Sequence, residues 1–303
     1  MMKLYVPFKS FGKDSHALEI LKEKFEVVGM TGERPDKNEL KKIAEEFDGL
    51  IIGAREKIDR EVLENSKLKV IGVLAGKENI DLEECKKKNI AVFDIIGSTA
   101  ISVAEHAFAL VLGLAKNILN MDRSVRDEEF GKFRISGVDL YGKTLGIIGA
   151  GYVAKEVIQR AKSFGMNILC WTFHPEKHKD LDVKFVELNY LLKNSDFVSI
   201  HIRLSEKTKS LIGKEELNLM KPTSFLVNTS RGEVVNEDAL VEALKNKKIA
   251  GAGLDVFKEE PTHNKELFKL NNIILTPHAA GVSRDAIITM DEKIAKDIVD
   301  YFD

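Results

Sequence analysis

The 303-residue sequence contains few cysteines, no excess of either charge and no long apolar run. Its two cysteines, Cys85 and Cys170, are too few for a disulfide framework and lack the spacing of metal ligands. We therefore expect no metal site and a reducing, cytoplasmic environment. A formal net charge of −2 offers neither the basic surface that nucleic acid requires nor a polybasic patch for a membrane. These scarcities argue against nucleic-acid and membrane partners.

The apolar segments are short as well. The first residues, MMKLYVPFKS, lack the apolar core of a secretory signal peptide. The most apolar stretch, residues 100–115, contains Glu105 and His106 and falls short of the roughly 20 residues that a membrane span needs. We predict a buried helix over about 101–120, in which His106 serves packing rather than chemistry.

Short β-rich runs alternate with amphipathic segments along the whole chain. A first series of strands is predicted over residues 3–8, 26–30, 49–53, 69–74 and 90–95. A second series is predicted over residues 143–149, 167–172, 196–202, 224–230, 251–257 and 272–277. Strands that alternate with helices are typical of parallel sheets with crossover helices, so we expect two α/β units. Ligands of such sheets bind at the carboxyl ends of the strands.

One turn has the pattern of a dinucleotide site. In KTLGIIGAGYVAKEV, Gly149, Gly151 and Ala154 fit G-x-G-x-x-G/A between an apolar strand and a helix. The first glycine permits the tight turn, the second lets the backbone approach a pyrophosphate, and the alanine keeps helix and strand close. Tyr152 and Val153 complete the turn, and the helix N-terminus would face the phosphate charge.

The next strand bears on the choice between NAD and NADP. NAD-users carry an acid at its end that grips the adenosine ribose. Here the strand ends in Thr172, and His174, Lys177 and His178 follow. The missing acid favours NADP, whereas an NAD site with hydroxyl contacts is the alternative.

Four stretches, GKTLGIIGAG, LVNTSRGEVVNEDAL, GAGLDVFKEEP and ILTPHAAG, stand in this order. Together they resemble the D-isomer-specific 2-hydroxyacid dehydrogenases, a group that includes glycerate, glyoxylate and phosphoglycerate dehydrogenases. The resemblance implies two doubly wound parallel-sheet domains. A Rossmann dinucleotide-binding domain (residues 99–282) would be inserted into a flavodoxin-like substrate domain made of residues 1–98 and 283–303, with a cleft between them. It also implies a homodimer, for which the helix at 101–120 is a candidate surface; core burial is the competing explanation for that helix.

The resemblance assigns a catalytic trio. Arg231 would bind the 2-keto acid, His278 would be the acid/base, and Glu260 would be its partner, leaving Glu259 as a solvated neighbour. The chemistry agrees, because a guanidinium holds a carboxylate bidentately and a histidine exchanges protons near neutral pH. A carboxylate beside the histidine stabilises its charged form. His201, which also ends a strand, is the rival acid/base.

The remaining site residues are carried over with the motifs. Asp255 matches the residue that holds the nicotinamide carboxamide, and His201 lines the adenine side. The full cofactor set is Gly149, Gly151, Tyr152, Val153, Ala154, Thr172, His174, His201, Thr208, Thr229 and Asp255. Arg203 replaces a family proline near the adenosine and is a further candidate for a ribose phosphate.

The substrate loop departs from the family pattern. It reads LAGKENID, with Leu74 in place of a glycine and Glu78 in place of an aspartate. Gly76 and Lys77 are still expected to present backbone amides to the substrate carboxylate. Arg55 is a candidate for a distal anionic group, although the family's arginine–serine pair is absent.

We therefore expect an oxidoreductase that uses NADP or NAD to reduce a small 2-keto acid such as glyoxylate or hydroxypyruvate. Two alternatives stay open. One is a short 3-phosphoglycerate dehydrogenase, and the other is a non-catalytic NAD(H)-sensing protein similar to the corepressors that resemble this family.

Overall fold

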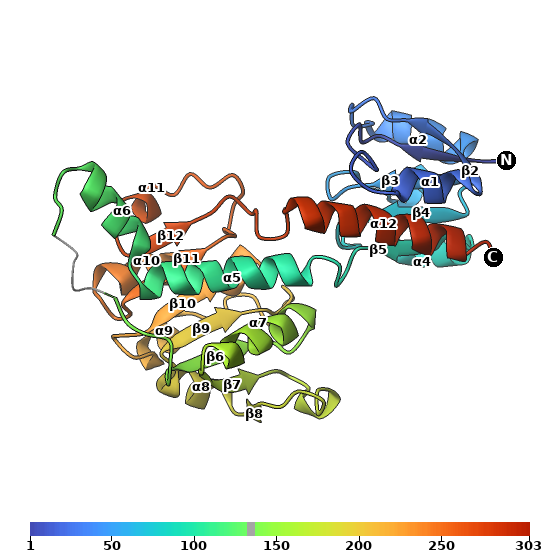
Figure 1. The fold of residues 1–303 in the computed structure, drawn as a ribbon. Coiled ribbons are helices and arrows are strands. Elements are labelled where there is room, and N and C mark those ends of the chain that lie inside the picture. Colours follow the sequence, from blue (N-terminus) through green and yellow to red (C-terminus); the bar gives the residue numbers. More distant parts are fainter. Residues whose placement is uncertain (132–136) are drawn as a thin grey trace. The chain divides into compact units, whose positions relative to one another are not determined.

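The structure is a computed structural model that describes residues 1–131 and 137–303 (Figure 1). Its contacts divide the chain into two compact units. Unit 1 comprises Met1–Thr99 and Val282–Asp303, and unit 2 comprises Ala100–Gly281.

Unit 1 is built on a five-stranded parallel sheet. Its strands are β1 (Met2–Val6), β2 (Phe25–Gly29), β3 (Gly49–Ile52), β4 (Val70–Val73) and β5 (Ala91–Asp94). They lie in the order β2-β1-β3-β4-β5, which is the flavodoxin-like order. Every residue of β3 and β4 is buried, as expected for central strands covered on both faces.

Helices cover both faces of this sheet. They are α1 (Ala17–Lys22), α2 (Lys37–Glu46), α3 (Arg60–Leu63), α4 (Leu82–Lys87) and α12 (Arg284–Asp300). One apolar cluster joins the sheet to α2, α3 and α4, and another joins it to α1 and α12. The final helix of the chain thus returns to complete the core of unit 1, where it packs beside α1 and β4 (Figure 1).

Unit 2 contains a seven-stranded parallel sheet. Its strands are β6 (Thr144–Ile148), β7 (Asn167–Trp171), β8 (Lys184–Phe185), β9 (Phe197–Ile200), β10 (Phe225–Asn228), β11 (Gly251–Leu254) and β12 (Ile273–Leu275). The order β12-β11-β10-β9-β6-β7-β8 runs outward in both directions from β6 and β9. This is the Rossmann arrangement with one added strand, and the crevice for a ligand opens at the β6/β9 switch point.

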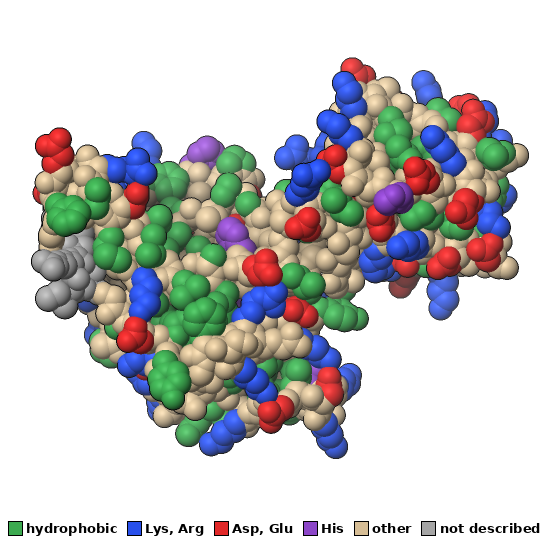
Figure 2. Space-filling view, viewed as in Figure 1, with side chains coloured by type: hydrophobic (Ala, Val, Ile, Leu, Met, Phe, Trp, Pro, Cys, Tyr) green, Lys and Arg blue, Asp and Glu red, His purple; other side chains and the backbone are tan. Residues whose placement is uncertain are grey.

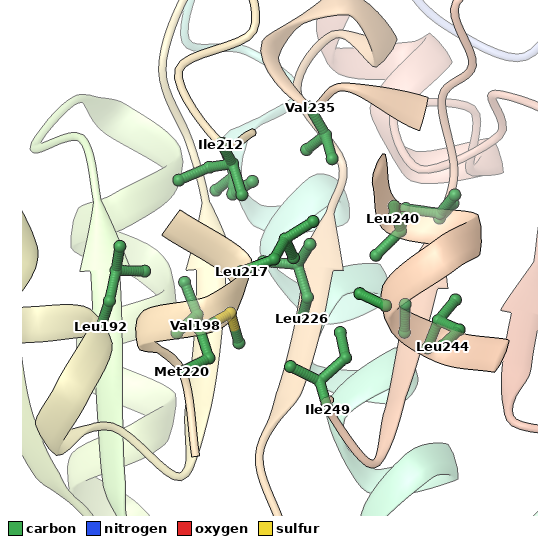
Figure 3. Close-up of a cluster of buried hydrophobic side chains, with 14 of the residues drawn as sticks. Leu192, Val198, Ile212, Leu217, Met220, Leu226, Val235, Leu240, Leu244 and Ile249 are labelled. Atoms are coloured by element: carbon green, nitrogen blue, oxygen red, sulfur yellow. The ribbon is translucent and has the colours of Figure 1, made fainter. Parts of the chain in front are cut away.

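The helices of unit 2 form a layer on each face. They are α5 (Ala100–Ala115), α6 (Ile118–Arg126), α7 (Tyr152–Ser163), α8 (Leu188–Asn194), α9 (Lys214–Leu219), α10 (Glu237–Lys245) and α11 (Lys265–Phe268), with short 3₁₀ turns at Pro175–Lys177 and Gly232–Val234. One face packs against α5 and α7. The other packs against α8, α9, α10 and α11, and Figure 3 shows part of this cluster, including Leu217, Leu226 and Leu240.

The two parallel sheets and their helices confirm the predicted fold class. The prediction of one continuous buried helix over 101–120 is wrong in two respects. The chain breaks into α5 and α6, bent by 60°, at Asn117, which has a left-handed φ of 52°; asparagine tolerates this conformation better than most residues. Only one face of α5 is buried, because Ile101, Glu105 and Ala109 are exposed.

The two cysteines form no disulfide. Both are free and buried, and burial raises the thiol pKa to about 11 for Cys85 and about 12 for Cys170. In the described ranges, no single helix is long and apolar enough to cross a membrane. The bent pair α5 and α6 reaches that length and apolar composition only when the two helices are taken together.

Candidate active site

The glycine turn lies where β6 meets α7. Gly149 has a φ of +108°, and a Cβ atom there would collide with the carbonyl oxygen of His201 at the end of β9. Only glycine fits both constraints. Gly151 precedes α7, and no described atom lies within 4 Å of a Cβ added to it. Ala154 is fully buried, and the twelve-residue helix α7 begins directly after Gly151, so its first amide groups have no partner within the helix.

The carboxyl end of β7 carries the residues expected near the adenosine ribose. Thr172 is half-buried at the tip, and His174 is exposed, with Nδ1 3.2 Å from Glu176 Oε1. Tyr152 is exposed and Val153 is half-buried in the first turn of α7. A carboxylate therefore does lie near this tip, although it follows the strand instead of ending it.

His201 directly follows β9, and the Oγ of Ser199 lies 2.8 Å from its Nε2. Burial lowers the pKa of His201 to about 4. At neutral pH this imidazole is therefore uncharged and has no proton to donate as an imidazolium. His201 is thus less suited to act as the acid/base.

Two threonines of the cofactor set differ in how their hydroxyls are used. Thr208 is buried and donates to the carbonyl oxygen of Arg203 at 2.7 Å, so its hydroxyl shapes its own loop. The hydroxyl of Thr229, at the end of β10, is buried and has no hydrogen-bond partner in the part of the chain that the structure describes. A buried hydroxyl without a partner is costly, and a bound ligand would satisfy it.

Arg231 follows β10 in a loop shaped by Asn228. The Asn228 side chain donates to the carbonyl oxygen of Arg231 at 2.9 Å and accepts from the amide of Ser230 at 3.0 Å. The guanidinium is exposed and donates to the carbonyl oxygen of Ser230 at 2.7 Å. Next to it, Gly232 packs so tightly on the backbone of Phe257 that no side chain fits there. The loop that carries Arg231 thus lies against the segment that leads to Glu260.

Glu260 and His278 form a direct pair. His278 Nδ1 donates to Glu260 Oε2 at 2.6 Å, and Glu260 Oε1 accepts from the amide of Phe257 at 3.1 Å. Both side chains are part-exposed, His278 to 47% and Glu260 to 36%. The Nδ1 contact leaves Nε2 of His278 available to exchange a proton with a ligand. Glu259 is exposed, and its side chain makes no hydrogen bond or ion pair with the residues that the structure describes.

Asp255 is buried beneath this pair. Its Oδ1 accepts from the hydroxyl of Thr276 at 2.6 Å and from the amide of Ala279 at 2.9 Å, and Oδ2 accepts from the amide of Ala280 at 2.9 Å. Its carbonyl oxygen accepts from the amide of His278 at 2.7 Å. In this structure Asp255 therefore holds the TPHAAG loop instead of presenting a free carboxylate.

The trio is thus brought together in part. The loops after β10, β11 and β12 converge, and Glu260 contacts His278 directly. No described contact joins the Arg231 guanidinium to either of them. The arrangement can bind an anion at Arg231 and transfer a proton at His278 Nε2, which are two requirements for reducing a keto acid.

In unit 1, Gly76 and Lys77 lie in the loop after β4. The Lys77 ammonium donates to the carbonyl oxygen of Val92 at 2.9 Å and lies 3.4 Å from Asp94 Oδ2, so it is anchored to β5. The Glu78 carboxylate occupies the space where a side chain on Gly76 would lie. Arg55 is exposed after β3.

Residues 108–280 match the family model of the NAD-binding domain of D-isomer specific 2-hydroxyacid dehydrogenases. The chain belongs to this family. The D-2-hydroxyacid dehydrogenases are oxidoreductases, and the chain is accordingly an NAD(P)-dependent enzyme that acts on CH–OH groups.

The chain is similar to several dehydrogenases of other organisms. The glyoxylate reductase of Thermococcus litoralis is 42% identical over 278 residues, which cover 88% of this chain and 84% of the relative. The D-3-phosphoglycerate dehydrogenase of Methanocaldococcus jannaschii is 40% identical over 275 residues, 89% of this chain and 52% of the relative. The NADPH-dependent glyoxylate/hydroxypyruvate reductase of Sinorhizobium meliloti, solved with citrate, has a TM-score of 0.86 at 26% identity and covers 100% of this chain and 95% of that one.

The residues of this dehydrogenase fit a nicotinamide dinucleotide. The turn at Gly149 and Gly151 leaves room for a backbone-bound pyrophosphate beside the α7 N-terminus. The partnerless hydroxyl of Thr229 follows β10, which is separated from β6 by β9 in the same sheet. No group of acidic, histidine and cysteine side chains in the described ranges is arranged to hold a metal ion.

Sequence reasoning missed two contributors to this dehydrogenase site. His106 lies with Nε2 2.9 Å from Thr276 Oγ1 and 3.5 Å from Asp255 Oδ1, although we expected it only to pack. Ser102, one turn earlier on α5, donates to the carbonyl oxygen of Ala280 at 2.9 Å. The only signal available was that two polar residues stand four apart within an apolar helix.

Proposed function

We propose that this dehydrogenase reduces glyoxylate and hydroxypyruvate, with His278 as the proton donor, Glu260 as its partner and Arg231 as the anchor for the substrate carboxylate. The single observation that carries this proposal is the 2.6 Å hydrogen bond between His278 Nδ1 and Glu260 Oε2. Because a carboxylate only accepts, this bond fixes a proton on Nδ1 and leaves Nε2 as the ring nitrogen that can exchange a proton with an alkoxide.

The mechanism assigns one task to each residue. Arg231 holds the carboxylate, and its charge polarises the adjacent carbonyl. The bound nicotinamide supplies the hydride. His278 gives its Nε2 proton to the developing alkoxide and recovers it in the reverse direction, while Glu260 stabilises the imidazolium.

The neutral state of His201 supports the choice of His278, because a histidine with a pKa of about 4 carries no donor proton to spare at neutral pH. We assign His201 to the adenine side, together with Thr172 and His174. Gly149, Gly151, Tyr152, Val153 and Ala154 would cradle the pyrophosphate. Thr208, Thr229 and Asp255 would line the rest of the cofactor, Thr208 through the loop that its hydroxyl shapes.

We assign substrate binding to unit 1 as well, through the loop amides of Gly76 and Lys77 and through Arg55. The anchored ammonium of Lys77 and the position of Glu78 favour a small substrate over one with a second strongly anionic group. Two relatives bear on the choice: the Thermococcus litoralis protein is a glyoxylate reductase, and the Sinorhizobium meliloti protein is a glyoxylate/hydroxypyruvate reductase that uses NADPH. The latter and the absence of an acid at Thr172 favour NADP over NAD.

We further propose that the enzyme is a cytoplasmic homodimer that pairs through α5 and its surroundings. Figure 2 shows hydrophobic side chains on the α5 side of unit 2. Exposed apolar residues of this part of the chain are Ile101 on α5, Ile118 and Leu119 on α6, and Phe164 after α7. An uncovered group of this kind is typical of an interface.

The test is a panel of 2-keto acids assayed with NADPH and NADH. Steady cofactor oxidation with glyoxylate or hydroxypyruvate supports the proposal, and faster oxidation of NADPH supports the cofactor preference. Because a D-3-phosphoglycerate dehydrogenase is 40% identical to the chain, 3-phosphoglycerate belongs in the reverse assay. Activity confined to that compound would replace the proposed substrates, and tight cofactor binding without turnover of any acid would indicate a sensor.

A further inference from the structure

His278 has an unusual backbone conformation. Its φ is 53°, in the left-handed region that a residue with a Cβ atom adopts at a cost. Such a conformation persists only when the surrounding contacts determine it. The groups that hold residues 276–281 therefore decide where the His278 imidazole lies.

Asp255 provides the first set of these contacts. Its carbonyl oxygen accepts from the amide of His278, and its two carboxylate oxygens accept from the amides of Ala279 and Ala280. The carboxylate is 1% exposed, so it is itself a buried charge that must be held.

Helix α5 provides a second set of contacts to the same loop. Ser102 donates to the carbonyl oxygen of Ala280 at 2.9 Å, and His106 Nε2 lies 2.9 Å from Thr276 Oγ1. These two α5 residues stand four apart and therefore point in the same direction. They reach both ends of the loop that carries His278.

The hydroxyl of Thr276 sets the direction of the hydrogen bonds. It has one proton, which it donates to Asp255 Oδ1 at 2.6 Å. The hydroxyl must then accept from His106, so Nε2 of His106 carries a proton. The same nitrogen lies 3.5 Å from Asp255 Oδ1 and so also faces the buried carboxylate.

We propose that Ser102 and His106 form a clamp on α5 that holds the His278 loop in its left-handed conformation. Both are positioning residues, since they act through Thr276, Asp255 and Ala280 and not on the substrate. The part of this inference that concerns turnover rests on the proposed function, whereas the part that concerns the loop does not.

The test compares three single variants. His106→Leu removes the donor, His106→Gln keeps an N–H close to the position of Nε2, and Glu105→Gln changes an exposed neighbour that pairs with Arg160. Because a displacement of about 1 Å at a reacting group costs about 100-fold, we expect His106→Leu to lower kcat by roughly 10- to 100-fold. The KM for the keto acid and the affinity for NADPH should stay near their wild-type values. His106→Gln should retain most of the activity, and Glu105→Gln should behave as the wild type.

A second readout is independent of activity. Hydrogen–deuterium exchange of the amides of residues 278–280 should accelerate in His106→Leu and not in His106→Gln. If the wild type turns over no keto acid, the proposed function fails, and the exchange measurement still decides the clamp. If His106→Leu does not fold, Thr276→Val, which removes one hydroxyl, should show the same loss of kcat and the same faster exchange.

Two results would overturn the clamp. One is wild-type kcat and wild-type exchange in a folded His106→Leu or Thr276→Val variant. The other is an equal loss in His106→Leu and His106→Gln, because the donor would then not be the feature that matters.

Discussion

Replacing Glu260 by glutamine isolates the charge of the group that contacts His278. The amide keeps an oxygen to accept from the amide of Phe257, so the loop geometry is preserved. It removes the negative charge 2.6 Å from His278 Nδ1. The variant should therefore lose stabilisation of the imidazolium while it retains its fold.

The size of the effect follows from the exposure of the pair. A hydrogen bond to a charged group contributes about 1.5–3 kcal/mol. Because His278 is 47% and Glu260 36% exposed, water screens the pair, and the lower part of that range applies, about 1.5–2 kcal/mol. Since 1.36 kcal/mol is a factor of ten in rate, kcat should fall by about 10- to 30-fold.

The assay is steady-state oxidation of NADPH with glyoxylate, run beside Glu259→Gln. That control makes the same charge change one residue away, on an exposed side chain. We expect Glu259→Gln to keep wild-type kcat and both variants to keep wild-type cofactor affinity. Equal losses in the two variants would refute the assignment of Glu260, since a general charge effect would then explain both.

Three other substitutions test separate parts of the structure. His278→Asn should reduce kcat far more than Glu260→Gln and leave NADPH binding near normal, as measured by fluorescence titration; unchanged turnover would reject its role. Gly149→Ala should abolish dinucleotide binding and destabilise unit 2, because its φ of +108° alone costs about 1–3 kcal/mol and the new Cβ meets His201; normal binding would contradict the glycine-turn site. Burial raises the pKa of Asp291 in α12 from 3.8 to about 6, so the folded state binds its proton more tightly than the unfolded state. That contribution to the free energy of unfolding, up to about 3 kcal/mol, is complete below about pH 4 and is lost as the pH rises through 6. Asp291→Asn should flatten this pH dependence, as measured by urea unfolding at pH 4 to 8. An unaltered slope would exclude Asp291 as its source.

The fold was predictable because its signals are local. Alternating apolar strands and amphipathic helices, together with the turn at Gly149, indicate parallel α/β units whatever the rest of the chain does. The break at Asn117 was not predictable, since the apolar pattern continues past it, and the two-residue strand β8 is too short to show a period. Glu260 could be chosen over Glu259 only through the motif, and the structure adds the contact that separates them.

The parts that sequence reasoning missed depend on contacts between distant residues. His106 and Thr276 are 170 positions apart, so no spacing rule connects them. The anchoring of Lys77 to Val92 and the full use of the Asp255 oxygens likewise follow from how strands and loops stack. The pKa of His201 depends on burial, which the sequence does not reveal at a strand end.

The configuration of the product tests whether the enzyme is a D-specific reductase with His278 as its proton donor. Hydroxypyruvate and an excess of NADPH are incubated with the purified protein, and the glycerate formed is separated by chiral chromatography. We expect D-glycerate in an amount equal to the NADPH oxidised, and far slower formation of it by the His278→Asn variant. L-glycerate, or D-glycerate at the wild-type rate from that variant, would contradict this expectation.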